Sequence, residues 1–112
     1  MKHNDDGKLA EKKVEDYLLS HGWEIIDTNW KTPKCEVDII AGKDGCAYFV
    51  EVKYRSGAAQ GQGFDYITTS KQKQMAYAAQ YWVQASDWPG EYVLSAASVS
   101  GENFEIEFLE EI

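Results

Sequence analysis

The sequence predicts one mixed domain of the α/β (α+β) class, in which helices flank a mixed sheet. Its 112 residues suit a single compact domain spanning residues 1–112. Two stretches place apolar residues at helical spacing, and five stretches are rich in β-forming residues. Their order is α-β-β-β-α-β-β, which predicts a three-stranded antiparallel unit followed by a helix and two further strands.

Residues 5–21 are predicted to form the first helix. Asp5 or Asp6 can cap its start, and Gly22 can end it. We interpret His21, at the helix end, as part of the C-terminal cap rather than as a metal ligand. Apolar spacing on one helix face is shown by Ala10, Val14, Tyr17, Leu18 and His21.

Three strands are expected next, over residues 23–30, 35–41 and 46–54. The last two flank Gly-Lys-Asp-Gly at 42–45, which predicts a β-hairpin closed by a four-residue turn. The strand over 46–54 contains the apolar run Ala-Tyr-Phe-Val. Such a run is typical of a strand that is covered on both faces, so we expect this strand to be central in the sheet.

The second half of the chain is predicted to add one helix and two strands. A glycine-rich connection over residues 56–63 leads to a helix over 69–86, followed by strands over 91–100 and 104–112. The last strand alternates phenylalanine or isoleucine with glutamate, as expected when one face of a strand is in water. One face of the second helix collects Met75, Ala78, Ala79, Trp82 and Val83.

The charge of the chain counts against nucleic-acid binding without excluding it. The net charge is −8, whereas affinity for DNA comes largely from lysine and arginine near phosphates. The charge is uneven, because residues 100–112 hold five acidic residues and no basic one. The rest of the chain therefore holds 14 acidic and 11 basic residues.

The expected compartment is the cytoplasm. Cys35 and Cys46 lie on the two arms of the predicted hairpin and out of register, so we expect free thiols in a reducing compartment. With two cysteines and two histidines at unsuitable spacings, a structural zinc site is not expected. The polar N-terminus is not a secretory signal, and no apolar run reaches the roughly 18 residues of a membrane helix.

Glu51 and Lys53 interrupt one face of the strand that we expect to be most buried. Residues two apart in a strand share a face, so these two side chains point the same way while Val50 and Val52 point to the other side. A buried carboxylate and ammonium are costly unless they are paired or bound to a metal. A plain ion pair between Glu51 and Lys53 is the simpler alternative, because the E-x-K pattern is very common.

Asp38 is expected to join this pair from the neighbouring strand. If the four-residue turn places Ala41 opposite Cys46, then Asp38 lies opposite Phe49 and diagonal to Glu51. Diagonal neighbours are roughly 7–8 Å apart at the backbone. Two carboxylates at that separation can converge on one hard cation such as Mg²⁺.

These groups together suit the hydrolysis of a phosphodiester. A metal held by Asp38, Glu51 and the Val52 carbonyl would activate water and polarise the phosphoryl oxygen. The Lys53 ammonium would orient the water or balance charge in the transition state.

Several segments resemble the YraN-like family of predicted endonucleases, which are related to archaeal Holliday-junction resolvases. The order and spacing are similar from Gly7 to about Tyr81. CEVDIIA resembles the family's G-E-I-D-L-I-A, and FVEVKYR resembles its F-V-E-V-K-T-R. The segments that carry the resemblance are GKLAEKKVEDYL (7–18), GWEIIDTNW (22–30), CEVDIIA (35–41), FVEVKYR (49–55) and GQGFDYITTSK (61–71).

The resemblance implies a restriction-endonuclease-like PD-(D/E)xK fold with Asp38, Glu51 and Lys53 as catalytic residues. It also implies Mg²⁺ or Mn²⁺ as the cofactor and adds Glu11, from the first helix, as an outer or second-metal ligand. A solvated helix glutamate is the alternative for Glu11. Glu36, which precedes the aspartate, is either structural or supports the site from outside. Candidate nucleic-acid contacts are Arg55, Lys71 and Lys73.

The chain departs from the family pattern at several positions. Cys35 stands where the family usually has glycine, Gly63 where it has proline, and Tyr66 where it has alanine. The acidic C-terminal strand is also unlike the basic character of these proteins. None of these changes removes a metal ligand, so they bear on substrate binding more than on the fold.

The expected function is that of a metal-dependent endonuclease acting on DNA, with branched and repair or recombination intermediates among its substrates. A homodimer is expected if both strands are cut, as in resolvases. Two alternatives stay open. One is a catalytically inactive nuclease-fold module that binds nucleic acid or protein. The other is an interaction protein whose acidic C-terminal strand engages a basic partner or mimics DNA.

Overall fold

The computed structural model describes residues 2–57 and 63–112. The described elements follow the predicted order, with one mixed sheet and two helices. Residues 58–62 of the predicted glycine-rich connection lie outside the described residues. The elements are α1 (Lys2–Ser20), β1 (Glu24–Lys31), β2 (Glu36–Lys43), β3 (Cys46–Arg55), α2 (Thr69–Ser86), β4 (Glu91–Ser100) and β5 (Glu105–Leu109).

The strands form a five-stranded sheet in the order β1-β2-β3-β4-β5. β1, β2 and β3 are antiparallel neighbours, β3 and β4 are parallel, and β4 and β5 are antiparallel. A parallel pair needs a crossover connection, and α2 supplies it between β3 and β4. β3 is therefore the central strand, as its apolar run predicts.

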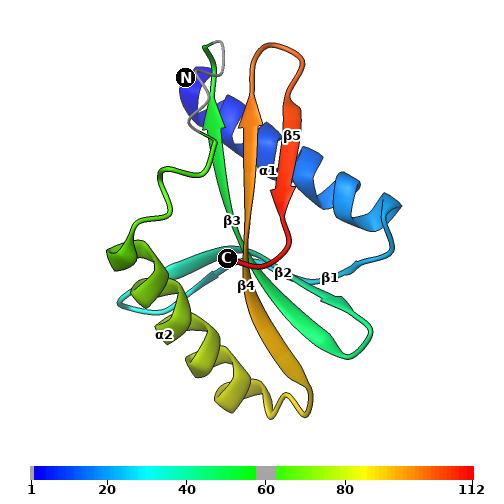
Figure 1. Ribbon diagram of the computed structural model, residues 1–112, viewed down its shortest axis with the longest axis vertical. Coiled ribbons are helices and arrows are strands. Elements are labelled where there is room, and N and C mark those ends of the chain that lie inside the picture. Colours follow the sequence, from blue (N-terminus) through cyan, green and yellow to red (C-terminus); the bar gives the residue numbers. More distant parts are fainter. Residues whose placement is uncertain (1, 58–62) are drawn as a thin grey trace.

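The two helices cover opposite faces of the twisted sheet (Figure 1). Val14 and Leu18 of α1 pack in one buried cluster with Val50 of β3. Trp82 of α2 packs in a second cluster with Phe49, the strand neighbour of Val50. Because successive strand residues point to opposite faces, β3 contributes to both clusters. The buried face predicted for α2 is confirmed at Met75, Ala78, Ala79 and Trp82.

The predicted closure of the β2–β3 hairpin is wrong by two residues. Lys43 pairs with Cys46, so the turn contains only Asp44 and Gly45. Both adopt left-handed backbone angles, with φ 55° and 79°. An Asp-Gly pair favours this two-residue turn, whose twist matches that of the flanking strands. Residues 42 and 43 therefore extend β2 instead of belonging to the loop.

This turn changes the register on which the site prediction depended. Ala41 pairs with Tyr48 rather than with Cys46, and Phe49 pairs with Ile40 rather than with Asp38. Asp38 consequently lies two residues closer along β3 to Glu51 than the longer turn would place it. The corrected register strengthens the expected juxtaposition of the two carboxylates.

The ends of α1 differ in how well they were predicted. The helix begins at Lys2, so Asp5 and Asp6 lie inside its first turns, and the predicted cap at either residue is wrong. The predicted end is confirmed, since Gly22 follows with φ 100° and the His21 Nδ1 atom lies 2.7 Å from the Tyr17 carbonyl oxygen.

The remaining boundaries agree closely with the sequence. α2 and β4 have the predicted bounds, and Thr68 caps α2 by accepting a hydrogen bond from the Lys71 backbone N–H at 3.1 Å. β5 is shorter than predicted and ends at Leu109. Cys35 and Cys46 are free thiols, as expected. Neither helix described has the length and apolar character needed to cross a membrane.

Candidate functional site

Asp38 and Glu51 meet where the ladder between β2 and β3 stops. The last pair is Ile39 with Val50. Immediately beyond it, an Asp38 carboxylate oxygen accepts a hydrogen bond of 2.8 Å from the Val52 backbone N–H. Asp38 is only 8% exposed, and Glu51 is half-buried. A side chain thus binds the Val52 N–H at the point where regular strand pairing ends.

The local environment disfavours the charged form of both carboxyl groups. Burial, helped by the nearby negative charge of Glu51, raises the pKa of Asp38 from 3.8 to about 7. The hydrogen bond from Val52 opposes this rise. Burial also raises the pKa of Glu51, although Lys71 acts in the opposite direction. The two groups therefore form a poorly solvated, negatively charged pair, which a cation would stabilise.

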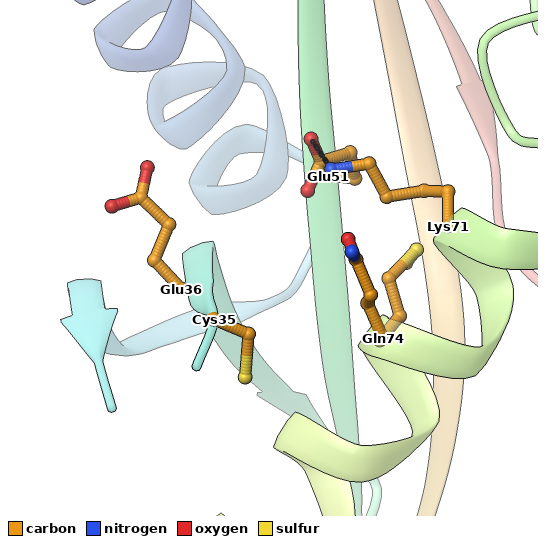
Figure 2. Close-up of a pocket in the computed structure, with 6 residues that line it drawn as sticks. Cys35, Glu36, Glu51, Lys71 and Gln74 are labelled. Carbon is orange, nitrogen blue, oxygen red and sulfur yellow. Dashed lines mark ion pairs between the residues drawn. The ribbon is translucent and has the colours of Figure 1, made fainter. Parts of the chain in front are cut away.

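Lys71 of α2 is the cation that Glu51 contacts in this structure. Its Nζ atom lies 3.3 Å from Glu51 Oε2 (Figure 2). Lys71 reaches across from the first turn of α2, so the crossover helix completes the site on this side. The pair borders a cavity of about 210 Å³, which is lined by Cys35, Glu36, Glu51, Lys71, Gln74 and Met75.

Lys53 does not pair with Glu51, although the two residues are only two positions apart on β3. Its side chain is exposed, and it forms no ion pair with another described residue. The alternative of a plain ion pair between Glu51 and Lys53 is therefore wrong, because Glu51 pairs with Lys71 instead. Strand alternation still directs Lys53 to the same side of β3 as Glu51. It remains a solvent-facing cation two residues from the carboxylate.

Glu11 approaches the site from α1. Its carboxylate contributes to the raised pKa of both Asp38 and Glu51. The side-chain amide of Asn29 donates a hydrogen bond of 3.2 Å to Glu11. Glu11 is half-buried, and the choice between a metal ligand and a solvated helix glutamate stays a prediction.

Asn29 is a site residue that the sequence reasoning missed. Thr28 pairs with Ile39 and Trp30 pairs with Val37, so Asn29 lies across from Asp38. Its φ is 51°, a left-handed angle inside a strand. Asparagine tolerates this conformation better than most residues. The sequence offered two signals for it, an asparagine inside a β-forming stretch and the resemblance of residues 22–30 to the family's strand that ends in asparagine.

Tyr66 and Arg55 connect β3 to the segment that leads into α2. The Tyr66 hydroxyl lies within hydrogen-bonding distance of the Glu51 and Ala97 carbonyl oxygens, at 3.2 and 3.0 Å. Arg55 pairs with Asp65 and donates to the Gly63 carbonyl oxygen at 3.1 Å.

The three predicted nucleic-acid contacts therefore lie in different settings. Arg55 is engaged in contacts within the protein, and Lys71 is bound to Glu51. Only Lys73 is exposed.

The donor set suits a hard divalent ion that keeps much of its water. In the described ranges, no group of three or more His, Cys, Asp or Glu side chains is close enough together to hold a metal. Asp38 and Glu51 supply two carboxylates, and the Val52 carbonyl lies beside them on β3. Mg²⁺ is commonly bound by one or two carboxylates together with waters and substrate phosphates. The residues present fit that kind of ion.

The chain matches, over residues 10–106, the family described as Uncharacterised protein family UPF0102. It belongs to the UPF0102 family. That family is the YraN-like family whose motifs the sequence resembles, so the resemblance is confirmed at family level. The matched residues include every candidate site residue of this UPF0102 protein, from Glu11 to Lys73.

Relatives in several bacteria carry the same family name. The UPF0102 protein FP2501 of Flavobacterium psychrophilum is 34% identical over 111 residues, covering 97% of this chain and 93% of the relative. The UPF0102 protein of Cytophaga hutchinsonii is 27% identical over 110 residues, covering 98% and 97%. The UPF0102 protein of Rhodococcus opacus is 39% identical over 80 residues, covering 71% and 68%. The similarity to the first two therefore extends over nearly the whole chain.

Proposed function

We propose that this UPF0102 protein is a metal-dependent endonuclease of the PD-(D/E)xK superfamily that hydrolyses phosphodiester bonds in DNA. Branched DNA and repair or recombination intermediates are the proposed substrates. The observation that carries the proposal is the meeting of Asp38 and Glu51 at the end of the β2–β3 ladder, with Lys53 on the same side of β3.

The residues of the site would have separate roles in binding the metal and in promoting hydrolysis. The Val52 N–H holds the Asp38 carboxylate in place. Asp38, Glu51 and the Val52 carbonyl would hold Mg²⁺ or Mn²⁺, with Glu11 as an outer ligand. When bound, the ion would stabilise the negative charge that grows on the phosphate. The exposed Lys53 ammonium would orient the attacking water and balance that charge.

In the metal-free site, Lys71 is the cation next to the Glu51 carboxylate. Its ammonium partly offsets the cost of burying the Glu51 carboxylate. Lys71 would be held less tightly when Glu51 serves as a metal ligand, because two cations near one carboxylate repel each other. The released ammonium, at the rim of the cavity, could then contact a DNA phosphate.

The direct test is nicking of supercoiled and branched DNA by the purified protein in Mn²⁺ or Mg²⁺. Wild-type protein is expected to cut, and Lys53→Ala is expected to lose at least about 100-fold in rate, as for a catalytic group with a charge-stabilising role. Lys12→Ala is the matched control, because it removes one exposed lysine whose partner on α1 is Asp16, and it should leave the rate unchanged. Cleavage by Lys53→Ala at the wild-type rate would contradict the role of Lys53.

A second candidate is a nuclease-fold module that binds nucleic acid or protein without cutting. It is favoured by the Glu51–Lys71 pair, which already neutralises one of the two carboxylates, and by the net charge of −8. Calorimetric titration of Mn²⁺ separates the candidates. The nuclease proposal expects binding by wild type and none by Asp38→Ala, whereas absence of binding by wild type would exclude the nuclease proposal.

The setting in the cell and the oligomeric state are also proposals. The free thiols Cys35 and Cys46 favour a reducing compartment, so we place the protein in the cytoplasm. A homodimer would let two sites cut two strands. Sedimentation analysis of the purified chain tests the dimer directly.

A further inference from the structure

Three aromatic side chains form a continuous strip beside the candidate site, with Tyr77 and Tyr81 exposed and Trp30 half-buried. The ring centroids of Tyr77 and Tyr81, one helical turn apart on α2, are 6.2 Å apart. The ring of Trp30, at the end of β1, lies 5.8 Å from Tyr81. Tyr77 and Tyr81 are 41% and 46% exposed, so both rings are open to a partner. We call Trp30, Tyr77 and Tyr81 the aromatic strip.

The strip lies in a basic part of an acidic protein. The Nζ atom of Lys34 lies 5.4 Å from the centre of the Tyr77 ring. The 18 residues of α2 include no acidic residue, and of its two lysines Lys71 pairs with Glu51 while Lys73 does not. Lys34 and Lys73 are both exposed. This local excess of positive charge contrasts with the net charge of −8 of the whole chain.

The strip begins next to the cavity that holds Glu51. Gln74 lines that cavity, and Tyr77 follows it by three residues on α2, so the two side chains are neighbours on the helix surface. Cys35 lines the cavity from the other side, and the adjacent residue is Lys34. Figure 1 shows the turn between β1 and β2 lying beside α2. A polymer that leaves the cavity along α2 would therefore reach the strip.

We propose that the aromatic strip, with Lys34 and Lys73, binds a segment of single-stranded DNA that continues from the candidate active site. Unpaired bases stack on exposed aromatic rings regardless of sequence, and nearby cations contact the phosphates. Bases inside a duplex cannot stack on these rings. The inference deepens the proposed function, on which it rests for the position of the scissile bond. The binding itself needs neither metal nor cleavage.

Charge favours this partner over a second copy of the chain. In a two-fold symmetric contact, the same patch of each copy faces the other. Lys34 and Lys73 of both copies would then be brought together, which is repulsive. A polyanion that presents flat apolar rings complements the charge and the shape of the strip at once.

The test measures binding of a fluorescein-labelled 20-nucleotide oligo(dT) by anisotropy, in EDTA and low salt, beside a blunt duplex of the same length. Wild type is expected to bind the single strand more tightly. Tyr77→Ala/Tyr81→Ala should weaken that binding by at least about tenfold, because each stacked base contributes substantially. Tyr77→Phe/Tyr81→Phe keeps both rings and should retain the wild-type affinity.

Matched controls separate local from general effects. Lys34→Ala and Lys12→Ala give the same net charge, but only Lys34→Ala should weaken binding and lower its dependence on salt. Leu19→Ala removes an apolar side chain on α1 that is 52% exposed, slightly more than either tyrosine, and should have no effect. Thermal denaturation of each variant establishes that it folds.

The outcomes distinguish this inference from the proposed function. If wild type fails to bind the oligonucleotide, or Tyr77→Ala/Tyr81→Ala binds it as tightly as wild type, the inference is overturned even if the protein cuts DNA. If the double variant changes only the sedimentation of the protein, the strip is a protein contact and the inference is also overturned. Binding that depends on the strip, without any cleavage in Mn²⁺, would support the inference and overturn the nuclease proposal.

Discussion

Replacing Asp38 by asparagine should stabilise the metal-free protein at pH 8. Burial raises the pKa of Asp38 from 3.8 to about 7, so the folded state binds this proton more tightly than the unfolded chain does. The contribution of Asp38 to stability is therefore fully present below pH 3.8 and is lost as the pH rises to about 7. Asparagine removes the charge, and its carbonyl oxygen can still accept the hydrogen bond from Val52.

The size of the effect follows from the same pKa. A rise of roughly 3 in pKa corresponds to about 4 kcal/mol in the free energy of unfolding. Relaxation of the site and entry of water reduce this, so we expect a gain of about 2–4 kcal/mol at pH 8. Near pH 4 wild type and variant should be equally stable, because the wild-type carboxyl is then protonated in the folded protein.

Urea denaturation in EDTA at pH 4, 6 and 8 measures this difference. Asp16→Asn is the control, since Asp16 is an exposed partner of Lys12 and its charge should matter little at any pH. In saturating Mn²⁺ the order should reverse at pH 8, because wild type gains binding energy that the variant lacks. A loss of stability in Asp38→Asn that is the same at all three pH values would refute the reasoning. It would show that the asparagine disturbs packing, and that the buried charge of Asp38 does not lower the stability of the wild-type protein.

Three further changes probe the residues around the carboxylates. Lys71→Met leaves Glu51 without its counter-ion. In urea denaturation it should lower the free energy of unfolding by roughly 1 kcal/mol at pH 8 but change it little at pH 4. An equal loss of stability at both pH values would contradict the ion-pair role. Tyr66→Phe removes the hydroxyl beside two carbonyl oxygens and should cost about 1–2 kcal/mol, seen as a lower Tm, whereas an unchanged Tm would mean that water replaces it. Asn29→Val forces a β-branched residue to a φ of 51°, so it should lower the free energy of unfolding in urea by about 1–2 kcal/mol. Asn29→Gly should lower it by less. Equal losses of stability in the two variants would show that the hydrogen bond to Glu11 matters more than backbone strain.

Much of the fold could be predicted from the sequence because it depends on patterns within a few residues. Helical spacing predicted the buried face of α2, and the apolar run at 47–50 predicted that β3 is central. The hairpin placed Asp38 and Glu51 on neighbouring strands. The turn was the exception, since Gly-Lys-Asp-Gly can close a hairpin in more than one way. The strongly favoured left-handed pair Asp44–Gly45 decided the register.

The partners within the site were decided only by the tertiary structure. Nothing local in the sequence links Glu51 to Lys71, and the two meet because the crossover helix returns over the sheet. The same holds for Asn29 with Glu11, which are 18 residues apart, and for Tyr66 with the β3 and β4 carbonyls. Periodicity records which face of an element is buried, but the distance between two side chains depends on how separate elements pack. The sequence could therefore indicate the acidic residues of the site, and the packing determined which cation lies beside them.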